Sequence, residues 1–179
     1  LLKFYSFYYI IRVFCKPKFN NLTFFKIFSF PIEKSENMDA KDIGAANVSA
    51  DGSEIYISTS SLYDGYGSCD IYCVKFTDGK WSAPHNINSI NSPEWESQPS
   101  ISADGKELYF VRGNRKAGTT DIFVSYRDFE GNWSKAERLS PKINTDGNER
   151  SPFIHHDGKT LYFSSDKHLG MGGFDLFVS

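Results

Sequence analysis

Cysteine is scarce in this 179-residue sequence, with only Cys15, Cys69 and Cys73 present. An odd number without regular spacing is not a disulfide framework. Cys69 and Cys73 are expected in one strand, roughly 13 Å apart and too far to bridge, so we assign these thiols to the core. Charge of one sign is equally scarce, because the formal net charge is −2. No basic field exists to attract nucleic acid or an anionic membrane, and we expect no nucleic-acid partner.

Reactive and ligand-binding motifs are also missing. There is no G-x-S-x-G nucleophile elbow and no glycine-rich loop followed by Lys and Ser or Thr. His155 and His156 adjoin Asp157, but neighbours in a strand point to opposite faces and do not easily share one metal ion. The stretch 144–149 lacks the alternating acidic ligands of a calcium loop. We therefore predict no catalytic residue, no metal site and no cofactor.

A long uninterrupted hydrophobic run is absent as well. Residues 1–31 are rich in apolar side chains, but Lys3 and Arg12 interrupt them before they reach the length of a membrane span. No small-residue cleavage site follows, so the segment is a poor secretory signal. Because the sequence does not begin with Met, we expect it to be part of a longer reading frame. Residues 1–43 receive no structural assignment.

Aromatic side chains, in contrast, are abundant: the sixteen Phe and ten Tyr favour sheets over helices. From about residue 44 the sequence is self-similar, with an Asp-Gly pair between apolar runs at Asp51, Asp104 and Asp157, spaced by 53 residues. Three more landmarks recur in the same order: an Asp before an apolar run (Asp70, Asp121, Asp175), a Trp-Ser pair (Trp81, Trp133), and an Ile-Asn pair with a Glu five residues after the Asn (Glu96, Glu149). Four landmarks in fixed order at one period establish an internal repeat.

Each repeat is predicted to form four short strands. In the central unit we place them at 98–102, 107–112, 121–126 and 133–139. The apolar run in the second of these does not alternate with polar residues, which is typical of a strand covered on both faces. Four antiparallel strands per unit with two-sided burial describe a propeller blade. The fold class is therefore all-β, a partial β-propeller of about two and a half blades over residues 44–179.

The repeated residues are interpreted as architecture. The Asp-Gly pairs predict tight hairpin turns, since Gly tolerates a positive φ (Asp51 and Gly52, Asp104 and Gly105, Asp157 and Gly158). The carboxylates that open the third strand are predicted to cap loop amides (Asp70, Asp121, Asp175). The two tryptophans are predicted to pack between blades (Trp81, Trp133).

These motifs resemble the WD40-like propeller repeats of the TolB type (PD40 repeats), with the signature S-P-D-G-K-x-L-Y-F-x-S and then a glycine-rich loop and Y-D-L/I-Y/F-V. The matching stretches are 102–110 and 156–165, and 170–179 is close to the version in OmpA-family outer-membrane proteins with a propeller. Ala replaces the Pro of the signature in two repeats, and the third reads His-His. The resemblance covers about residues 44–179.

The resemblance implies a non-enzymatic, protein-binding propeller of a bacterial cell-envelope protein, in the periplasm or at the outer membrane. Its partners would be envelope proteins, and peptidoglycan would be reached only through a domain not present here. An alternative is the ancillary propeller of a peptidase or carbohydrate-active enzyme, and a third possibility is glycan binding through aromatic side chains. Glu96, Glu149 and Arg150 precede or begin the innermost strands near one mouth of the channel, so we predict them as the polar contacts of a ligand or partner.

Overall fold

The computed structural model describes residues 43–60, 62–114 and 116–179, and within these ranges it contains β-strands and no helix. The predicted all-β class is therefore confirmed. The segment 1–43, for which the sequence predicts nothing, lies outside the described residues except for Ile43, the first residue of the first strand. No helix able to span a membrane occurs in the described part of the chain.

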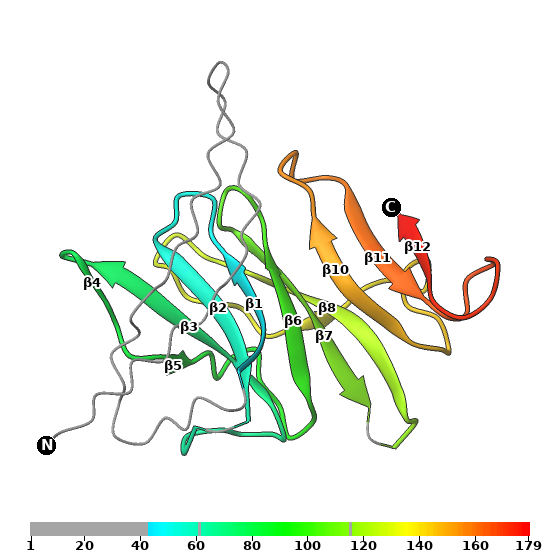
Figure 1. Cartoon of the computed structure of the whole chain (residues 1–179), viewed down its shortest axis with the longest axis horizontal. Coiled ribbons are helices and arrows are strands. Elements are labelled where there is room, and N and C mark those ends of the chain that lie inside the picture. The colour runs from blue at the N-terminus through cyan, green and yellow to red at the C-terminus, as the bar shows by residue number, and fades with distance from the viewer. Residues whose placement is uncertain (1–42, 61, 115) are drawn as a thin grey trace, which may run out of the picture.

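The strands form three antiparallel sheets, which lie side by side as successive blades (Figure 1). The first blade contains β1 (Ile43–Val48), β2 (Glu54–Thr59), β3 (Asp70–Thr77), β4 (Lys80–Trp81) and β5 (His85–Asn86). The second contains β6 (Glu96–Ile101), β7 (Glu107–Asn114), β8 (Thr119–Tyr126) and β9 (Glu137–Arg138), and the third contains β10 (Glu149–Ile154), β11 (Leu161–Ser165) and β12 (Asp175–Val178). The first strands of the blades, β1, β6 and β10, contact one another in turn and form the inner edge.

The Asp-Gly pairs form the turns between the first and second strands of every blade. Gly52, Gly105 and Gly158 have φ values of 74°, 71° and 66°, which a residue with a Cβ rarely adopts. The preceding carboxylate accepts a backbone hydrogen bond two residues further on, as in the 3.0 Å bond from Ser53 N to Asp51 Oδ1. The repeated Asp therefore fixes the turn that sets the strand register.

A bulge interrupts each inner strand near its start. In β6 and β10 it contains a non-glycine residue in the left-handed region, Gln98 with φ 55° and Ser151 with φ 53°. Ser151 N donates to Gln98 Oε1 at 2.7 Å, so the two bulges are joined across neighbouring blades. The 53-residue period thus extends to backbone irregularities as well as to strands.

Apolar side chains pack between the first two blades. Tyr56, Ile71 and Cys73 of the first blade meet Leu108 and Phe110 of the second in one buried cluster. Because successive strand residues point to opposite faces, Ile55, Ile57, Tyr72 and Val74 form a separate cluster on the other face of the first blade. This two-sided burial explains why the second and third strands read as unbroken apolar runs.

The fourth strand is shorter than predicted. Residues 133–139 were expected as a strand, but only Glu137–Arg138 forms one, and Trp133 makes a single bridge to Arg127. A side-chain hydrogen bond replaces part of the backbone pairing here, since Ser134 Oγ accepts a hydrogen bond from Tyr126 N at 3.0 Å. In the first blade Pro84, which has no N–H to donate, separates β4 from β5.

The turn carboxylates should make stability fall in acid. Hydrogen bonds from Ser49 and Ser53 lower the pKa of Asp51 from 3.8 to about 2, and similar bonds lower the pKa values of Asp104 and Asp157. A carboxylate whose pKa is lower in the folded than in the unfolded state stabilises the fold at a pH above its unfolded-state pKa. This contribution is lost as the pH falls through the folded-state pKa. We expect the free energy of unfolding, measured by urea titration, to decline from pH 3.8 to about 2. A variant with all three replaced by Asn should show a shallower decline, and an unchanged slope would contradict this assignment.

Candidate functional site

Glu96 and Glu149 begin the inner strands β6 and β10, as the sequence suggested, but neither reaches the surface. Both are 0% exposed. Glu96 accepts hydrogen bonds from the backbone N–H and hydroxyl of Ser92, and Glu149 accepts the same pair from Thr145, with Thr145 N at 3.0 Å and Thr145 Oγ1 at 2.7 Å. In this structure they hold the segment before the inner strand, and a ligand would have to displace these bonds to reach them.

The two glutamates differ in their remaining partner. Arg112 Nε donates to Glu96 Oε1 at 2.6 Å, whereas Ser165 Oγ donates to Glu149 Oε1 at 2.8 Å. Burial raises the pKa of Glu96, against the opposing effects of Ser92 and Arg112. Arg150 is the one member of the predicted trio that is exposed, and its guanidinium carbon lies 4.8 Å from the centre of the Phe174 ring.

Asn91 and Asn144, the asparagines of the recurring Ile-Asn pairs, have a structural role that the repeat pattern alone did not reveal. Asn91 Oδ1 accepts from Ile71 N and its amide donates to Ile71 O, both at 2.9 Å. Asn144 makes the same pair of bonds to Ile122, both at 2.8 Å. Each amide thus pairs with the third strand as a backbone group would. The recurrence of Ile-Asn at the repeat period was the signal that could have revealed this role.

The carboxylates that open the third strand behave differently from blade to blade. Asp70 accepts hydrogen bonds from the backbone N–H groups of Tyr66 and Gly67, and Asp175 accepts them from Met171 at 2.7 Å and Gly172 at 3.3 Å. Both therefore cap loop amides, as predicted.

Asp121 departs from this pattern. It accepts from Arg138 Nη2 at 2.7 Å, and the amides of its loop, at Lys116 and Ala117, donate to Asn114 Oδ1 instead. The loop before Asp121 is shorter than the other two, so a residue at its start can reach the amides and the Asp is released for an ion pair. The prediction of loop capping was wrong for this residue.

The two repeated tryptophans pack on blades. Trp133 of the second blade meets Tyr56 of the first in an edge-to-face contact with ring centres 6.1 Å apart. Trp81 packs on the opposite face of the first blade, against the cluster of Ile55, Ile57, Tyr72 and Val74. The equivalence of the two positions means that the same ring recurs on the same face of the first and second blades.

An ion pair crosses the boundary between the first two blades beside Trp133. Arg127 donates two hydrogen bonds to Glu54, at 2.9 Å and 2.6 Å, and Lys75 lies 3.4 Å from the same carboxylate. Arg127 and Tyr56 outweigh burial and lower the pKa of Glu54. A cavity of about 300 Å³ opens next to this pair, with Lys75, His85, Arg127 and Trp133 in its wall.

The reactive side chains are not poised for chemistry. Burial raises the pKa of Cys73 to about 12 and that of Cys69 to about 11, so both thiols stay protonated at neutral pH. His155 and His156 lie in a turn, not in a strand, and their ring centres are 3.9 Å apart, so the expectation that they point to opposite faces was wrong. Among the described residues no group of three or more His, Cys, Asp or Glu could hold a metal ion.

Replacing Asp70 should loosen the loop that it caps. In Asp70→Ala the amides of Tyr66 and Gly67 lose a charged acceptor, and we expect their hydrogen-exchange protection to fall by about 2 kcal/mol. Asp121→Ala is the matched control, because the described amides of its loop, at Lys116 and Ala117, donate to Asn114 and their exchange should be unchanged. Equal losses in both loops would show that the caps are not the cause.

Breaking the Glu54–Arg127 ion pair between blades should destabilise the fold more than removing Lys75, the more exposed partner of Glu54. Glu54→Gln leaves Arg127 partly buried without its counter-charge, and we expect a loss of about 3 kcal/mol in thermal or urea unfolding. Lys75→Met removes the longer and more exposed contact and should cost less than about 0.5 kcal/mol. A similar cost for both would mean that Arg127 is not the dominant partner.

The sequence matches no protein-family model and no curated protein. The structure is similar to TolB from Acinetobacter baumannii, with a TM-score of 0.53 and 18% identity over 79% of this chain and 30% of that one. It is also similar to a putative TolB from Agrobacterium tumefaciens, with a TM-score of 0.52 and 20% identity over 76% of this chain and 44% of that one. The chain thus spans less than half the length of either structure, and what it shares with them is the β-propeller fold, of which it forms a part.

Proposed function

We propose that this chain is a non-enzymatic, protein-binding part of a propeller in the bacterial cell envelope. The observation that carries the proposal is a set of apolar side chains on the loops between the second and third strands. Tyr66 is 65% exposed and Met171 is 97% exposed, and Tyr63 and Leu169 beside them are also exposed. Large apolar residues exposed on loop tips of a rigid scaffold, here on one loop of the first blade and one of the third, are typical of a surface that binds another protein.

The two loops present these side chains in the same way. Tyr66 and Met171 each lie four residues before the capping carboxylate, and each donates its backbone N–H to it. A loop held in one conformation loses little entropy on binding, so the exposed side chain contributes more of its contact energy to affinity. Tyrosine and other large side chains of this kind are common among the residues that dominate binding energy at interfaces.

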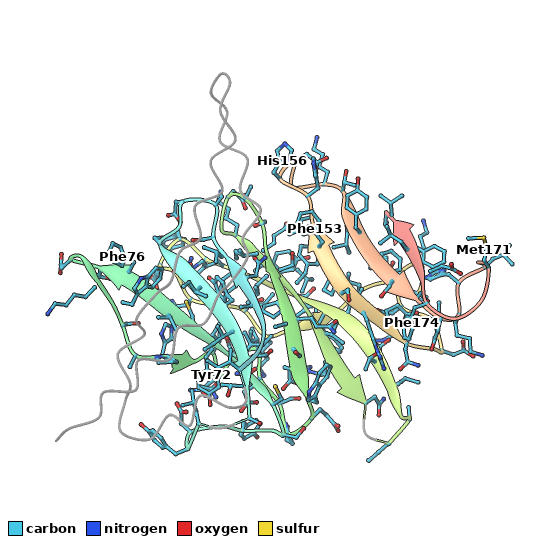
Figure 2. All side chains as sticks on the ribbon, viewed as in Figure 1. Tyr72, Phe76, Phe153, His156, Met171 and Phe174 are labelled. Atoms are coloured by element: carbon cyan, nitrogen blue, oxygen red, sulfur yellow. The ribbon has the colours of Figure 1, made fainter. Side chains whose placement is uncertain are left out.

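Strand direction places the loops at one end of the blades. The hairpins between first and second strands, which contain the Asp-Gly turns, lie at the other end. Figure 2 shows the separation in the third blade, where His156 lies at one end of β11 and Met171 beyond the other end. The proposed binding end therefore carries the apolar loop tips of Tyr66 and Met171, while the opposite end carries the Asp-Gly turns and the β8–β9 turn with the exposed Phe129.

A non-enzymatic role is supported by the state of the ionisable side chains. The buried carboxylates of Asp70, Glu96 and Glu149 each accept several intramolecular hydrogen bonds, and the thiols of Cys69 and Cys73 have raised pKa values. None of these groups is available as a base or nucleophile in its present contacts.

The cellular setting of the proposal rests on the resemblance of the repeat motifs to TolB-type propellers, together with the shared fold. We place the chain in the periplasm, where an envelope protein would be its partner. An OmpA-family parent, with peptidoglycan bound by a separate domain, remains the more specific form of this proposal.

Site-specific photocrosslinking in the cells that produce the protein tests the binding end. A photoreactive residue at position 66 or 171 should form discrete crosslinks to another protein, because both side chains project from capped loops. Phe129 is the control position, since it is 99% exposed but lies on the β8–β9 turn at the opposite end. Once the partner is identified, Tyr66→Ser with Met171→Ser should weaken its affinity roughly tenfold or more.

The proposal fails if positions 66 and 171 give no protein crosslink, or if position 129 gives the same products. Crosslinks confined to another domain of the same parent chain would instead favour an ancillary propeller of an enzyme.

A further inference from the structure

A histidine packs the loop that carries Met171 against its own blade. His168 lies three residues before Met171, and the centre of its ring lies 5.0 Å from that of Phe177 and 5.7 Å from that of Phe163. Because a carbonyl can only accept, His168 Nε2 donates to Ile143 O at 2.8 Å, in the connection between the second and third blades. The loop is therefore docked on the blade in addition to being capped by a carboxylate.

In the second blade an arginine of the strand occupies the same place. The guanidinium carbon of Arg112 lies 4.4 Å and 5.7 Å from the ring centres of Phe123 and Phe110, the equivalent aromatic pair. Its Nη2 donates at 2.6 Å to Ile90 O, the equivalent carbonyl of the preceding connection. His168 thus makes from the loop the contacts that Arg112 makes from β7.

The residue at the position of Arg112 in the third blade is Ser165. Each pairs with the glutamate that begins the inner strand, and Ser165 Oγ donates to Glu149 Oε1 at 2.8 Å. The same hydroxyl accepts from His168 N at 3.3 Å. A small side chain at this position leaves the aromatic pair uncovered by the strand, and the turn that it stabilises brings the histidine onto the pair.

The loop of the first blade is docked at the equivalent position of the third strand. Tyr72 is the counterpart of Phe177, and its hydroxyl donates to Asp64 Oδ1 at 3.0 Å. Asn86 Nδ2 donates to Asp64 O at 3.1 Å. Since Asp64 lies two residues before Tyr66, both loops with exposed apolar tips carry a docking residue shortly before the tip.

Docking matters most in the third blade, where glycines flank Met171. The stretch 170–173 has three glycines, which leave the backbone more conformational freedom than other residues would. Asp175 holds the amides of Met171 and Gly172 from the C-terminal side. His168 holds the loop from the N-terminal side, so the tip is fixed between two contacts.

We propose that His168 and Asp64 are positioning residues of the binding end, and that they set the direction in which Met171 and Tyr66 are presented to a protein partner. This inference rests on the protein-binding function proposed above. A tip that is already ordered loses less conformational entropy when the partner binds, so removing the docking contact weakens binding without removing any residue that touches the partner.

Hydrogen exchange and photocrosslinking of the whole chain test the proposal together. In His168→Ala we expect the amides of Met171 and Gly172 to exchange about tenfold faster, because the loop keeps only its C-terminal cap. A photoreactive residue at position 171 should crosslink to its protein partner several-fold less in this variant than in the original chain. Lys167→Ala is the matched control, since its side chain is an exposed neighbour in the same loop, and it should change neither readout.

The double variant Ser165→Arg with His168→Ala separates positioning from stability. It returns the covering side chain to the strand, as in the second blade, where an arginine covers the aromatic pair. We expect the thermal unfolding temperature to recover to that of the original chain. The fast exchange of Met171 and the reduced crosslinking at position 171 should remain, because the loop is still not docked.

Tyr72→Phe tests the first blade and serves if the double variant does not fold. The other two blades have Phe at this position, so the ring fits and only the hydroxyl that holds Asp64 is lost. We expect faster exchange of the Tyr66 amide and several-fold weaker crosslinking at position 66, with no change at position 171.

The proposal is overturned, and the protein-binding function stands, if the original chain crosslinks at positions 66 and 171 and His168→Ala and Tyr72→Phe crosslink equally well. It is also overturned if the double variant restores crosslinking at position 171, since the histidine would then only stabilise the blade. No crosslink from either position in the original chain overturns the proposed function itself, and this inference with it.

Discussion

The blades of this protein depend on the burial of sheet faces against each other. The second and third strands have apolar side chains on both faces, so a single blade cannot cover itself. Tyr56 and Cys73 are buried in a cluster to which Leu108 and Phe110 of the next blade contribute. The need to cover each face explains the repetition itself, since every blade supplies the surface that its neighbour must bury.

Polar contacts then fix how neighbouring blades meet. The connection between blades uses Asn91 and Asn144 to pair with the third strand, and Glu96 and Glu149 to hold the chain at the start of the next inner strand. Each of these side chains is buried and satisfied, so the connection has one arrangement. Rigid blades in turn allow the exposed loops to vary, which is where the proposed binding function lies.

Much of the architecture could be predicted from the sequence. The period, the Asp-Gly turns and the unbroken apolar runs are local patterns, and they correctly indicated an all-β propeller. The fourth strand was predicted too long because the Ser134 side chain takes over part of the pairing with Tyr126, which strand propensity does not record. Asp121 was misassigned because loop length, rather than residue type, decides whether the carboxylate reaches the loop amides.

The candidate site shows where local reasoning ends. The sequence alone determined that this protein is a repeat of four-stranded units, because turn chemistry and strand periodicity act over a few residues. Only the tertiary structure decided that Glu96 and Glu149 are buried while Arg150 is exposed, and that His168 takes the place of Arg112. Exposure and juxtaposition depend on which segments, tens of residues apart, lie against each other, and spacing along one strand does not carry that information.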